Sequence, residues 1–269
     1  AEGMRRFSPS AINEYMRCQL LFFYNRVAKI KAPQKQAVII EPNVLGSVFH
    51  KTAELFYLDF VKHGNPVITP ARLAPFLEPA ADASLVFYVR RAMAEEQVSE
   101  NVLVEQIVKS FFKQLLRNDS KLETFKIKGL ETPRSLTFNV LVNGAVRQVE
   151  LCGIIDRMDI VSDSTINDGT ETLRIVDYKT NGSMEQAFSM DALFTPGEKH
   201  PHYVLQTFLY ALMVAPDVNS MPLMPTLFFV NKYGDKTFLP YIKYANEPLT
   251  DFALSLIHIS EPTRRVVIS

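Results

Sequence analysis

Two charged residues lie two positions apart at the end of an apolar run, in the stretch LRIVDYKTNG at residues 173–182. Side chains alternate between the two faces of a β-strand, so Asp177 and Lys179 project from one face while Val176 and Tyr178 take the other. For an isolated Asp-x-Lys, the simplest interpretation is an ion pair at a solvated strand end, which contributes little stability. The spacing alone therefore establishes no chemistry.

A second carboxylate precedes this strand, because Asp156 ends the apolar stretch GIID. If the two strands pair, Asp156 and Asp177 converge, and close carboxylates repel each other unless a proton or a cation lies between them. Carboxylate ligands favour Mg²⁺ or Mn²⁺ over softer ions. Such a metal lowers the pKa of a bound water, and a neighbouring Lys179 can stabilise developing negative charge or orient the water. The pattern predicts a metal-dependent hydrolase.

The elements that precede these strands are expected to be helical. Ser8 followed by Pro9 is a helix start signal, and side chains at i, i+3 and i+4 spacing extend this amphipathic helix to about Phe23. Apolar stripes predict a second helix at about 44–61 and further helices over 71–117. The helical part of the domain is thus expected at about 7–120.

The apolar pattern then changes from a helical period to a period of two residues, which is typical of β-strands. Alternating residues on both sides of Asn143-Gly144 predict a β-hairpin, and IIDRMDIV at 154–161 is expected to form a third strand. The fold class is therefore α/β (α+β), a central mixed sheet flanked by helices with an N-terminal helical segment, and the catalytic sheet core is expected at about 135–245. After the Asp177 strand, the pattern closes with a helix at about 202–214 and strands at 225–231 and 236–244.

Composition excludes several classes of protein. The 269 residues are 47% hydrophobic, which is enough for a sizeable core, and 29 basic residues balance 29 acidic ones, so no global field attracts nucleic acid or membrane. Residues 1–35 are an exception, since seven Lys or Arg against two Glu give this segment a net charge of +5. The two cysteines make no disulfide framework, and neither a membrane span nor a secretory signal is apparent. We therefore expect a cytoplasmic protein.

Both ends of the chain are unusual. The start AEGMRRFSPS has no initiator methionine at position 1, which suggests a piece of something longer. Residues 255–269 resemble translated sequencing-adaptor read-through, so we expect a non-native tail after a domain at 1–254.

Three further motifs occur in order with GIIDRMD and VDYKT across roughly residues 7–211. They are FSPSAINEYMRCQLLFFY near the start, LGSVFHKTAEL with its G-x-x-x-H pattern, and QTFLYAL with its Q-x-x-x-Y pattern. The set resembles the RecB-like branch of the PD-(D/E)XK nuclease superfamily, and within it the nuclease domain of AddB-type helicase–nuclease subunits. The resemblance implies a restriction-endonuclease-like core.

The resemblance also implies roles for particular residues. His50, Asp156 and Asp177 would be metal ligands, the Tyr178 carbonyl a further ligand, and Lys179 the catalytic lysine. From the sequence alone, a histidine on an amphipathic helix is more often a core or surface residue, and imidazole is not a preferred ligand of Mg²⁺.

Two helical residues complete the implied site. Gln206 and Tyr210 would support the site and contact substrate, although at i and i+4 they would equally form a simple hydrogen bond along a helix face. Glu54 lies one turn after His50 and is either part of the site or solvated. Asp159 lies at an odd offset from the first carboxylate, so it is expected to be structural or to pair with Arg157 or Arg174.

Many relatives bind an iron–sulfur cluster through one cysteine near the start of the domain and three near its end. Cys18 matches the first, and no trio follows in this sequence, so a [4Fe–4S] cluster is expected in a full-length protein only. Cys152, in a predicted strand, is expected to be a small buried residue. No G-x-x-x-x-G-K-[ST] phosphate loop is present, so a motor would come from an N-terminal helicase-like region or a helicase subunit.

We therefore expect a Mg²⁺-dependent DNA nuclease, an exonuclease acting on single strands or duplex ends, as the C-terminal nuclease domain of an AddB-like subunit in double-strand break repair and recombination. Two alternatives remain. One is a stand-alone RecB-like exonuclease of the CRISPR-adaptation type, and the other a non-catalytic DNA-binding or assembly module on the same fold.

Overall fold

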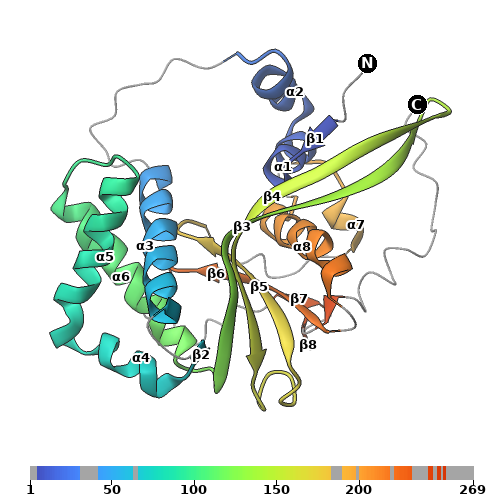
Figure 1. Ribbon diagram of the computed structural model, residues 1–269. Coiled ribbons are helices and arrows are strands. Elements are labelled where there is room, and N and C mark those ends of the chain that lie inside the picture. The colour runs from blue at the N-terminus through green and yellow to red at the C-terminus, as the bar shows by residue number, and fades with distance from the viewer. Residues whose placement is uncertain are drawn as a thin grey trace.

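The computed structural model describes residues 5–30, 42–62, 66–182, 190–197, 200–218, 221–231, 242–244, 247–249 and 251–252. A mixed β-sheet runs through the middle of this part of the chain (Figure 1). Its strand order is β2-β3-β4-β5-β6, and β1 pairs in parallel with β4. The strands β5 and β6 are parallel to each other, whereas β2 to β5 pair antiparallel. The strands are β1 (Arg5–Phe7), β2 (Val67–Ile68), β3 (Thr124–Val142), β4 (Ala145–Ser162), β5 (Thr172–Lys179) and β6 (Leu223–Phe229), and a separate ladder joins β7 (Lys243–Tyr244) to β8 (Glu247–Pro248).

Helices cover both faces of the sheet, as Figure 1 shows. On one face α3, α5 and α6 pack against β3 to β6 in one apolar core, and on the other face α8 and part of α1 pack against β4 to β6 in a second core. All residues of β6 and all but the last of β5 are buried. The nearly continuous apolar sequence of β6 agrees with this burial, whereas β5 also buries the charged Arg174 and Asp177. The helices are α1 (Pro9–Arg17), α2 (Gln19–Phe22), the π-helical turn Phe23–Val27, α3 (Pro42–Lys62), α4 (Pro70–Leu77), the 3₁₀ turn Pro79–Ala81, α5 (Asp82–Glu95), α6 (Val102–Asp119), α7 (Met190–Leu193), α8 (His202–Val214) and the 3₁₀ turn Ala215–Asp217.

The first helix begins where the sequence predicts and ends sooner. Ser8 is the N-cap, because its side chain accepts a hydrogen bond of 3.2 Å from the Ala11 amide, and Pro9 occupies the first turn. The prediction of one helix to Phe23 is wrong, since Cys18 adopts an extended conformation (φ −159°, ψ 108°) between α1 and α2. Phe23 is consequently half-exposed rather than packed on the core.

The predicted hairpin at Asn143-Gly144 is confirmed, with φ +50° and +78° at its two turn residues. Its tip projects away from the rest of the molecule (Figure 1). The prediction of a separate strand at 154–161 is wrong, because β4 runs without interruption from Ala145 to Ser162. Gly153 is no turn residue: a Cβ there would lie 2.9 Å from Cε1 of Tyr210, so this glycine permits α8 to approach the strand.

The predicted class, a central mixed sheet flanked by helices, is confirmed. Among the described residues, no helix combines the length and apolar character needed to cross a bilayer. Of the last predicted strand, 236–244, the structure describes only 242–244, where β7 lies, and the predicted non-native tail at 255–269 is outside the described residues.

Candidate active site

The antiparallel pairing of β4 and β5 brings the two predicted carboxylates together. Arg157 pairs with Val176, so the adjacent Asp156 and Asp177 are neighbours at the end of this ladder. Both side chains are buried, and Asp156 Oδ2 accepts a 2.7 Å hydrogen bond from the Tyr178 amide. The expectation that these strands pair is therefore confirmed.

Lys179 lies on the same face of β5 as Asp177. Its Nζ is 2.5 Å from Asp177 Oδ2, a buried oxygen that has no hydrogen bond of good geometry. Burial alone would lower the pKa of Lys179, but Asp177 and Asp156 outweigh this effect and raise it. The lysine is thus held in its charged form next to the two carboxylates.

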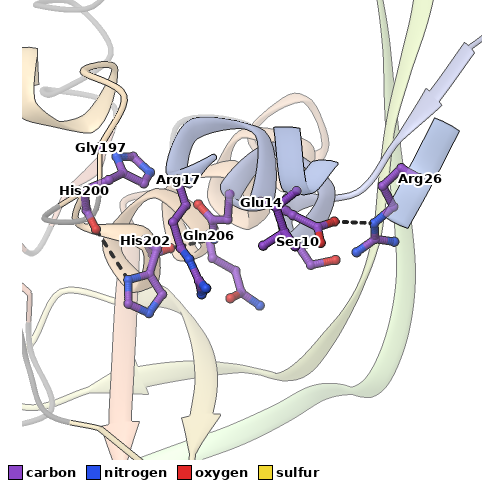
Figure 2. Close-up of a pocket in the computed structure, with 10 residues that line it drawn as sticks. Ser10, Glu14, Arg17, Arg26, Gly197, His200, His202 and Gln206 are labelled. Carbon is purple, nitrogen blue, oxygen red and sulfur yellow. Dashed lines mark hydrogen bonds and ion pairs between the residues drawn. The ribbon is translucent and has the colours of Figure 1, made fainter. Parts of the chain in front are cut away.

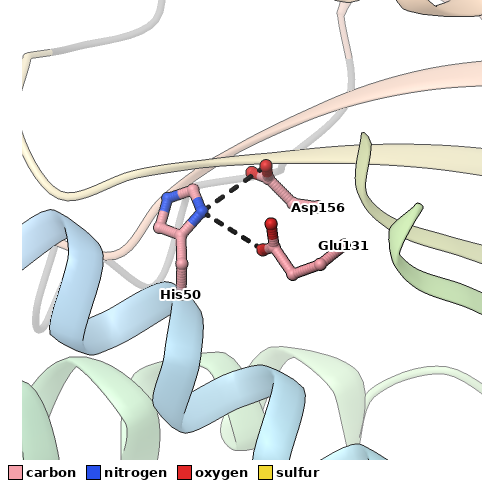
Figure 3. Close-up of side chains that lie close together, drawn as sticks. All are labelled: His50, Glu131 and Asp156. Atoms are coloured by element: carbon pink, nitrogen blue, oxygen red, sulfur yellow. Dashed lines mark ion pairs between the residues drawn. The ribbon is translucent and has the colours of Figure 1, made fainter. Parts of the chain in front are cut away.

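His50 projects from α3 toward Asp156 and a further carboxylate, Glu131 (Figure 3). His50 Nδ1 lies 3.4 Å from Asp156 Oδ1 and 3.7 Å from Glu131 Oε1. One ligand atom from each of the three residues lies within 4.8 Å of the others. Burial would lower the pKa of His50, but the two carboxylates raise it to about 10.

Glu131 was not predicted from the sequence. It lies in β3 between Leu130, which pairs with Arg157, and Thr132, which pairs with Ile155, and therefore lies opposite Asp156. Its φ of +41° is rare for a residue with a side chain and is found next to a shift of register at Gly129. A glycine and a proline around an acidic residue, in GLETP, are the sequence signal for this irregularity.

The two central carboxylates have opposite pKa shifts. Burial, together with repulsion by Asp156, raises the pKa of Asp177 to about 6 despite the attraction of Lys179. For Asp156, burial acts in the same direction, but His50 and Lys179 overcome it and lower the pKa. The negative charge of Asp156 is therefore well compensated by nearby cationic side chains, whereas the charge of ionised Asp177 is not fully compensated.

Gln206 of α8 connects the lysine to its carboxylate. Its Oε1 accepts from Lys179 Nζ at 3.3 Å, and its Nε2 lies 3.4 Å from Asp177 Oδ1 and 3.1 Å from Tyr210 Oη. The helix-face hydrogen bond between Gln206 and Tyr210 thus exists, and Gln206 also reaches the two strand residues. Burial raises the pKa of Tyr210.

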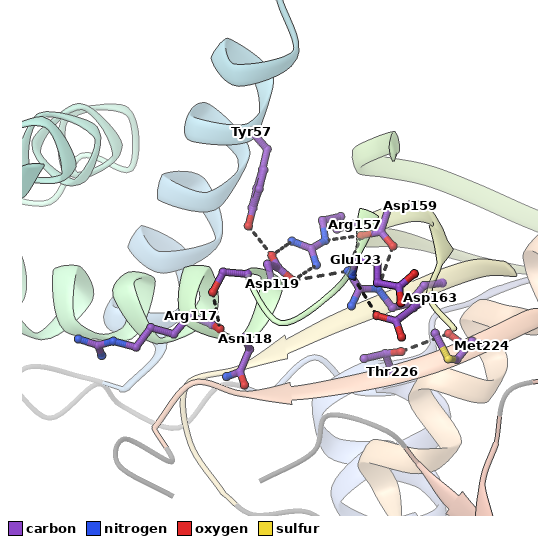
Figure 4. A network of polar contacts seen from close by, with 12 residues as sticks. Tyr57, Arg117, Asn118, Asp119, Glu123, Arg157, Asp159, Asp163, Met224 and Thr226 are labelled. Atoms are coloured by element: carbon purple, nitrogen blue, oxygen red, sulfur yellow. Dashed lines mark hydrogen bonds and ion pairs between the residues drawn. The ribbon is translucent and has the colours of Figure 1, made fainter. Parts of the chain in front are cut away.

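A buried charge network lies beneath the site and joins the elements that carry it (Figure 4). Arg157 makes two hydrogen bonds to Asp119, of 2.7 and 2.9 Å, and Arg174 makes two to Asp159, both of 2.8 Å. Arg157 Nε is also 2.9 Å from Asp159, and the Tyr57 hydroxyl donates to Asp119. The prediction that Asp159 pairs with Arg157 or Arg174 is confirmed for both arginines, and the network ties α3, α6, β4 and β5 together.

The side chains of the remaining predicted residues do not contact Asp156 or Asp177. Cys18 is exposed between α1 and α2, and Cys152 is half-buried in β4. Glu54 forms an ion pair with Lys51, 2.6 Å long, on the surface of α3. The Tyr178 side chain packs into the first core, 5.4 Å from the ring of Phe49.

Residues 6–265 match the model of a family described as the PD-(D/E)XK nuclease superfamily. The chain belongs to this superfamily. The (D/E)XK pattern of the superfamily name is present as Asp177-Tyr178-Lys179. No curated protein matches the chain. The mixed sheet with its flanking helices is consistent with a restriction-endonuclease-like fold.

PD-(D/E)XK nucleases use divalent metals, and the donor set of this member fits one. His50, Glu131 and Asp156 place an imidazole nitrogen and two carboxylate oxygens within reach of one ion. Beside them, Asp177 has a raised pKa although its Oδ2 is paired with Lys179. A cation at this position would relieve the repulsion between the carboxylates.

Proposed function

We propose that this PD-(D/E)XK nuclease is a Mg²⁺- or Mn²⁺-dependent deoxyribonuclease that acts as an exonuclease. The observation that carries the proposal is the position of Asp156 on β4 next to the ion-paired Asp177 and Lys179 at the end of β5, with His50 and Glu131 beside Asp156. This arrangement combines carboxylate ligands for a hard cation with a buried ammonium that remains charged.

Each residue has a role in phosphodiester hydrolysis, in which water attacks phosphorus and the bond to the 3′ oxygen breaks. A metal held by His50, Asp156 and Asp177, with the Tyr178 carbonyl as a further ligand, would polarise a phosphoryl oxygen and lower the pKa of a water. Lys179 stabilises the negative charge that develops on the phosphoryl group, since its raised pKa makes it a poor base.

Residues on α8 support this lysine. Gln206 restricts the Lys179 ammonium through its 3.3 Å hydrogen bond, and Tyr210 restrains Gln206 in turn. In this proposal, both residues act by positioning the lysine, and the amide of Gln206 is also close enough to the carboxylate pair to contact a bound phosphate.

We further propose that the chain is the nuclease domain of an AddB-like subunit that processes DNA double-strand breaks in the cytoplasm together with a helicase. The order of motifs over residues 7–211 and the basic segment 1–35 support this. In the same proposal, Cys18 is one ligand of a [4Fe–4S] cluster, and its exposed position between α1 and α2 leaves it accessible to partner cysteines. A stand-alone exonuclease remains the alternative that needs no helicase, whereas the intact Asp156, Asp177 and Lys179 argue against a non-catalytic module.

Cleavage of labelled single-stranded DNA by the purified protein tests the central proposal. We expect cleavage with Mg²⁺ or Mn²⁺, none with EDTA, and none in Lys179→Ala. The matched control is Lys126→Ala. Lys126 is an exposed lysine on β3, and it lies closer to the start of that strand than the site residue Glu131 does. Activity of Lys179→Ala equal to that of Lys126→Ala would show that this lysine has no part in the reaction.

A further inference from the structure

A cleft of about 620 Å³ lies between α1 and the start of α8 (Figure 2). Its lining includes Asn13, Glu14 and Arg17 from α1, Arg26 from the following π-helical turn, and His202 and Gln206 from α8. The cleft therefore joins the N-terminal helical segment to the helix that supports the candidate active site.

Two hydrogen bonds hold the walls of the cleft together. Asn13 Nδ2 donates to the His202 carbonyl at 2.8 Å, and the Gly197 amide donates to the Met16 carbonyl at 2.9 Å. Ile12 and Met16 of α1 also pack against the second apolar core. The cleft is thus a built feature of the fold, and its two walls keep a defined separation.

The cleft is connected to the candidate active site through one of its lining residues, Gln206. Gln206 lines the cleft and also accepts a hydrogen bond from Lys179 and contacts Asp177. A polymer bound along the cleft would consequently place one of its units at the proposed reaction centre.

The charges of the cleft suit a polyanion. Arg17 is exposed and has no ion-pair partner among the described residues, and the guanidinium of Arg26 is 46% exposed beside Glu14, 2.7 Å away. Burial lowers the pKa of His202, so at neutral pH this ring is an uncharged hydrogen-bonding group. Two guanidinium groups thus face one carboxylate.

A second cleft, on the His50 side of the site, has mainly acidic charged side chains. Its volume is about 390 Å³, and its lining includes Glu54, Glu96 and Glu131 with Lys51 as its lysine. Without a bound cation, its three carboxylates outnumber its cationic side chains and disfavour a phosphate backbone. Of these two clefts, only the one at α1 therefore has an excess of cationic side chains.

We propose that the α1–α8 cleft binds the sugar–phosphate backbone of single-stranded DNA next to the scissile phosphate, with Arg17 and Arg26 as phosphate contacts. The inference deepens the proposed nuclease function and rests on it. A single strand fits the cleft because one backbone can pass between the joined walls, whereas a duplex presents two strands on a rigid, broad rod.

Binding of a fluorescent oligothymidylate, measured by anisotropy in EDTA with Lys179→Ala as the parent protein, tests the proposal. Loss of one phosphate contact on a single strand reduces the salt slope of log K by about 0.7, which corresponds to about five-fold weaker binding at 0.1 M salt. We expect this change for Arg17→Ala. Arg90→Ala is the matched control, because this exposed arginine lies on α5, far from the cleft, and should leave the affinity and the slope unchanged.

Glu14→Gln gives a change of opposite sign. It removes the carboxylate that neutralises Arg26 and retains an oxygen that accepts from Asn25, so binding should become up to about five-fold tighter. Damage to the fold cannot explain weaker binding in one variant and tighter binding in the other.

The outcomes separate this inference from the nuclease proposal. If Arg17→Ala binds like Arg90→Ala, or if Glu14→Gln does not bind more tightly, the cleft is not the strand path, whether or not the unmodified chain cleaves DNA. Equal losses of affinity for a hairpin duplex and for the oligothymidylate would refute the single-strand specificity. Absence of cleavage by the unmodified chain would refute the nuclease proposal, and the binding result would then stand alone.

Discussion

Replacing Asp119 with asparagine tests whether the buried charge network holds the site-bearing elements together. Asp119 is 1% exposed and receives two hydrogen bonds from Arg157 and one from the Tyr57 hydroxyl. Asparagine keeps one acceptor oxygen and turns an NH₂ group toward the guanidinium, so at least one charge-assisted hydrogen bond is lost, and Arg157 is left with Asp159, which also pairs with Arg174, as its counter-charge. Removing one partner of a buried ion pair costs about 3–5 kcal/mol.

Asp82 provides a matched comparison, because it also binds two cationic side chains, Lys109 and Lys113, but is 39% exposed. Asp82→Asn should therefore cost at most about 1 kcal/mol. Urea denaturation of the two variants, followed by circular dichroism, gives both free energies of unfolding. Equal losses for Asp119→Asn and Asp82→Asn would refute the reasoning that burial gives the network its strength.

The effect at Asp119 also has a predicted pH dependence. Burial would raise the pKa of Asp119, but Arg157 outweighs it, so the folded-state pKa lies below the ordinary value of 3.8. Its contribution to stability is thus fully present above pH 3.8 and is lost as pH falls through the lower, folded-state pKa. The difference between the parent protein and Asp119→Asn should shrink in strong acid, and a constant difference would contradict this assignment.

Further predictions concern the site itself. In EDTA at pH 7, Asp177→Asn should unfold at a higher temperature than the parent, because a folded-state pKa of about 6 means that ionised Asp177 opposes folding. This gain in stability should vanish below pH 3.8. A variant that is less stable than the parent at pH 7 would contradict the prediction. His50→Ala should weaken Mn²⁺ binding in calorimetry more than it weakens DNA binding, and unchanged Mn²⁺ affinity would remove His50 from the metal ligands. Glu131→Gln should reduce Mn²⁺ affinity at least about ten-fold, as loss of a ligating or supporting carboxylate does, whereas Glu54→Gln, which alters the surface of α3, should not.

The part of the site that lies on regular strands could be predicted from the sequence. Alternation along β5 places Asp177 and Lys179 on one face, and the odd offset of Asp159 correctly assigns it to the arginine pairs instead. Glu131 could not be predicted in this way, because its positive φ breaks the alternation of β3. Long-range pairs such as Asp119 with Arg157 leave no periodic signal either.

The errors in the predicted elements have a similar origin. The extended conformation of Cys18 ends α1 although the apolar spacing continues to Phe22 and Phe23. The separate strand predicted at 154–161 starts directly after Gly153, a residue whose role depends on a helix that follows much later in the chain. Local patterns thus gave the element types and the strand chemistry, and contacts between distant segments decided the boundaries.

Gly153 has a consequence for how Lys179, the proposed catalytic lysine, is held. A methyl group at this position would press on Cε1 of Tyr210 at 2.9 Å and on Cε of Met213 at 3.3 Å. Tyr210 and Gln206 lie one turn apart on α8, so a helix displaced outward would carry Gln206 with it, and the 3.3 Å bond to Lys179 is already long. The absence of a side chain at position 153 thus sets the spacing between sheet and helix, and with it the distance from the Gln206 amide to Lys179. A substitution there should change the rate of the proposed reaction without altering any of the residues proposed to take part in it.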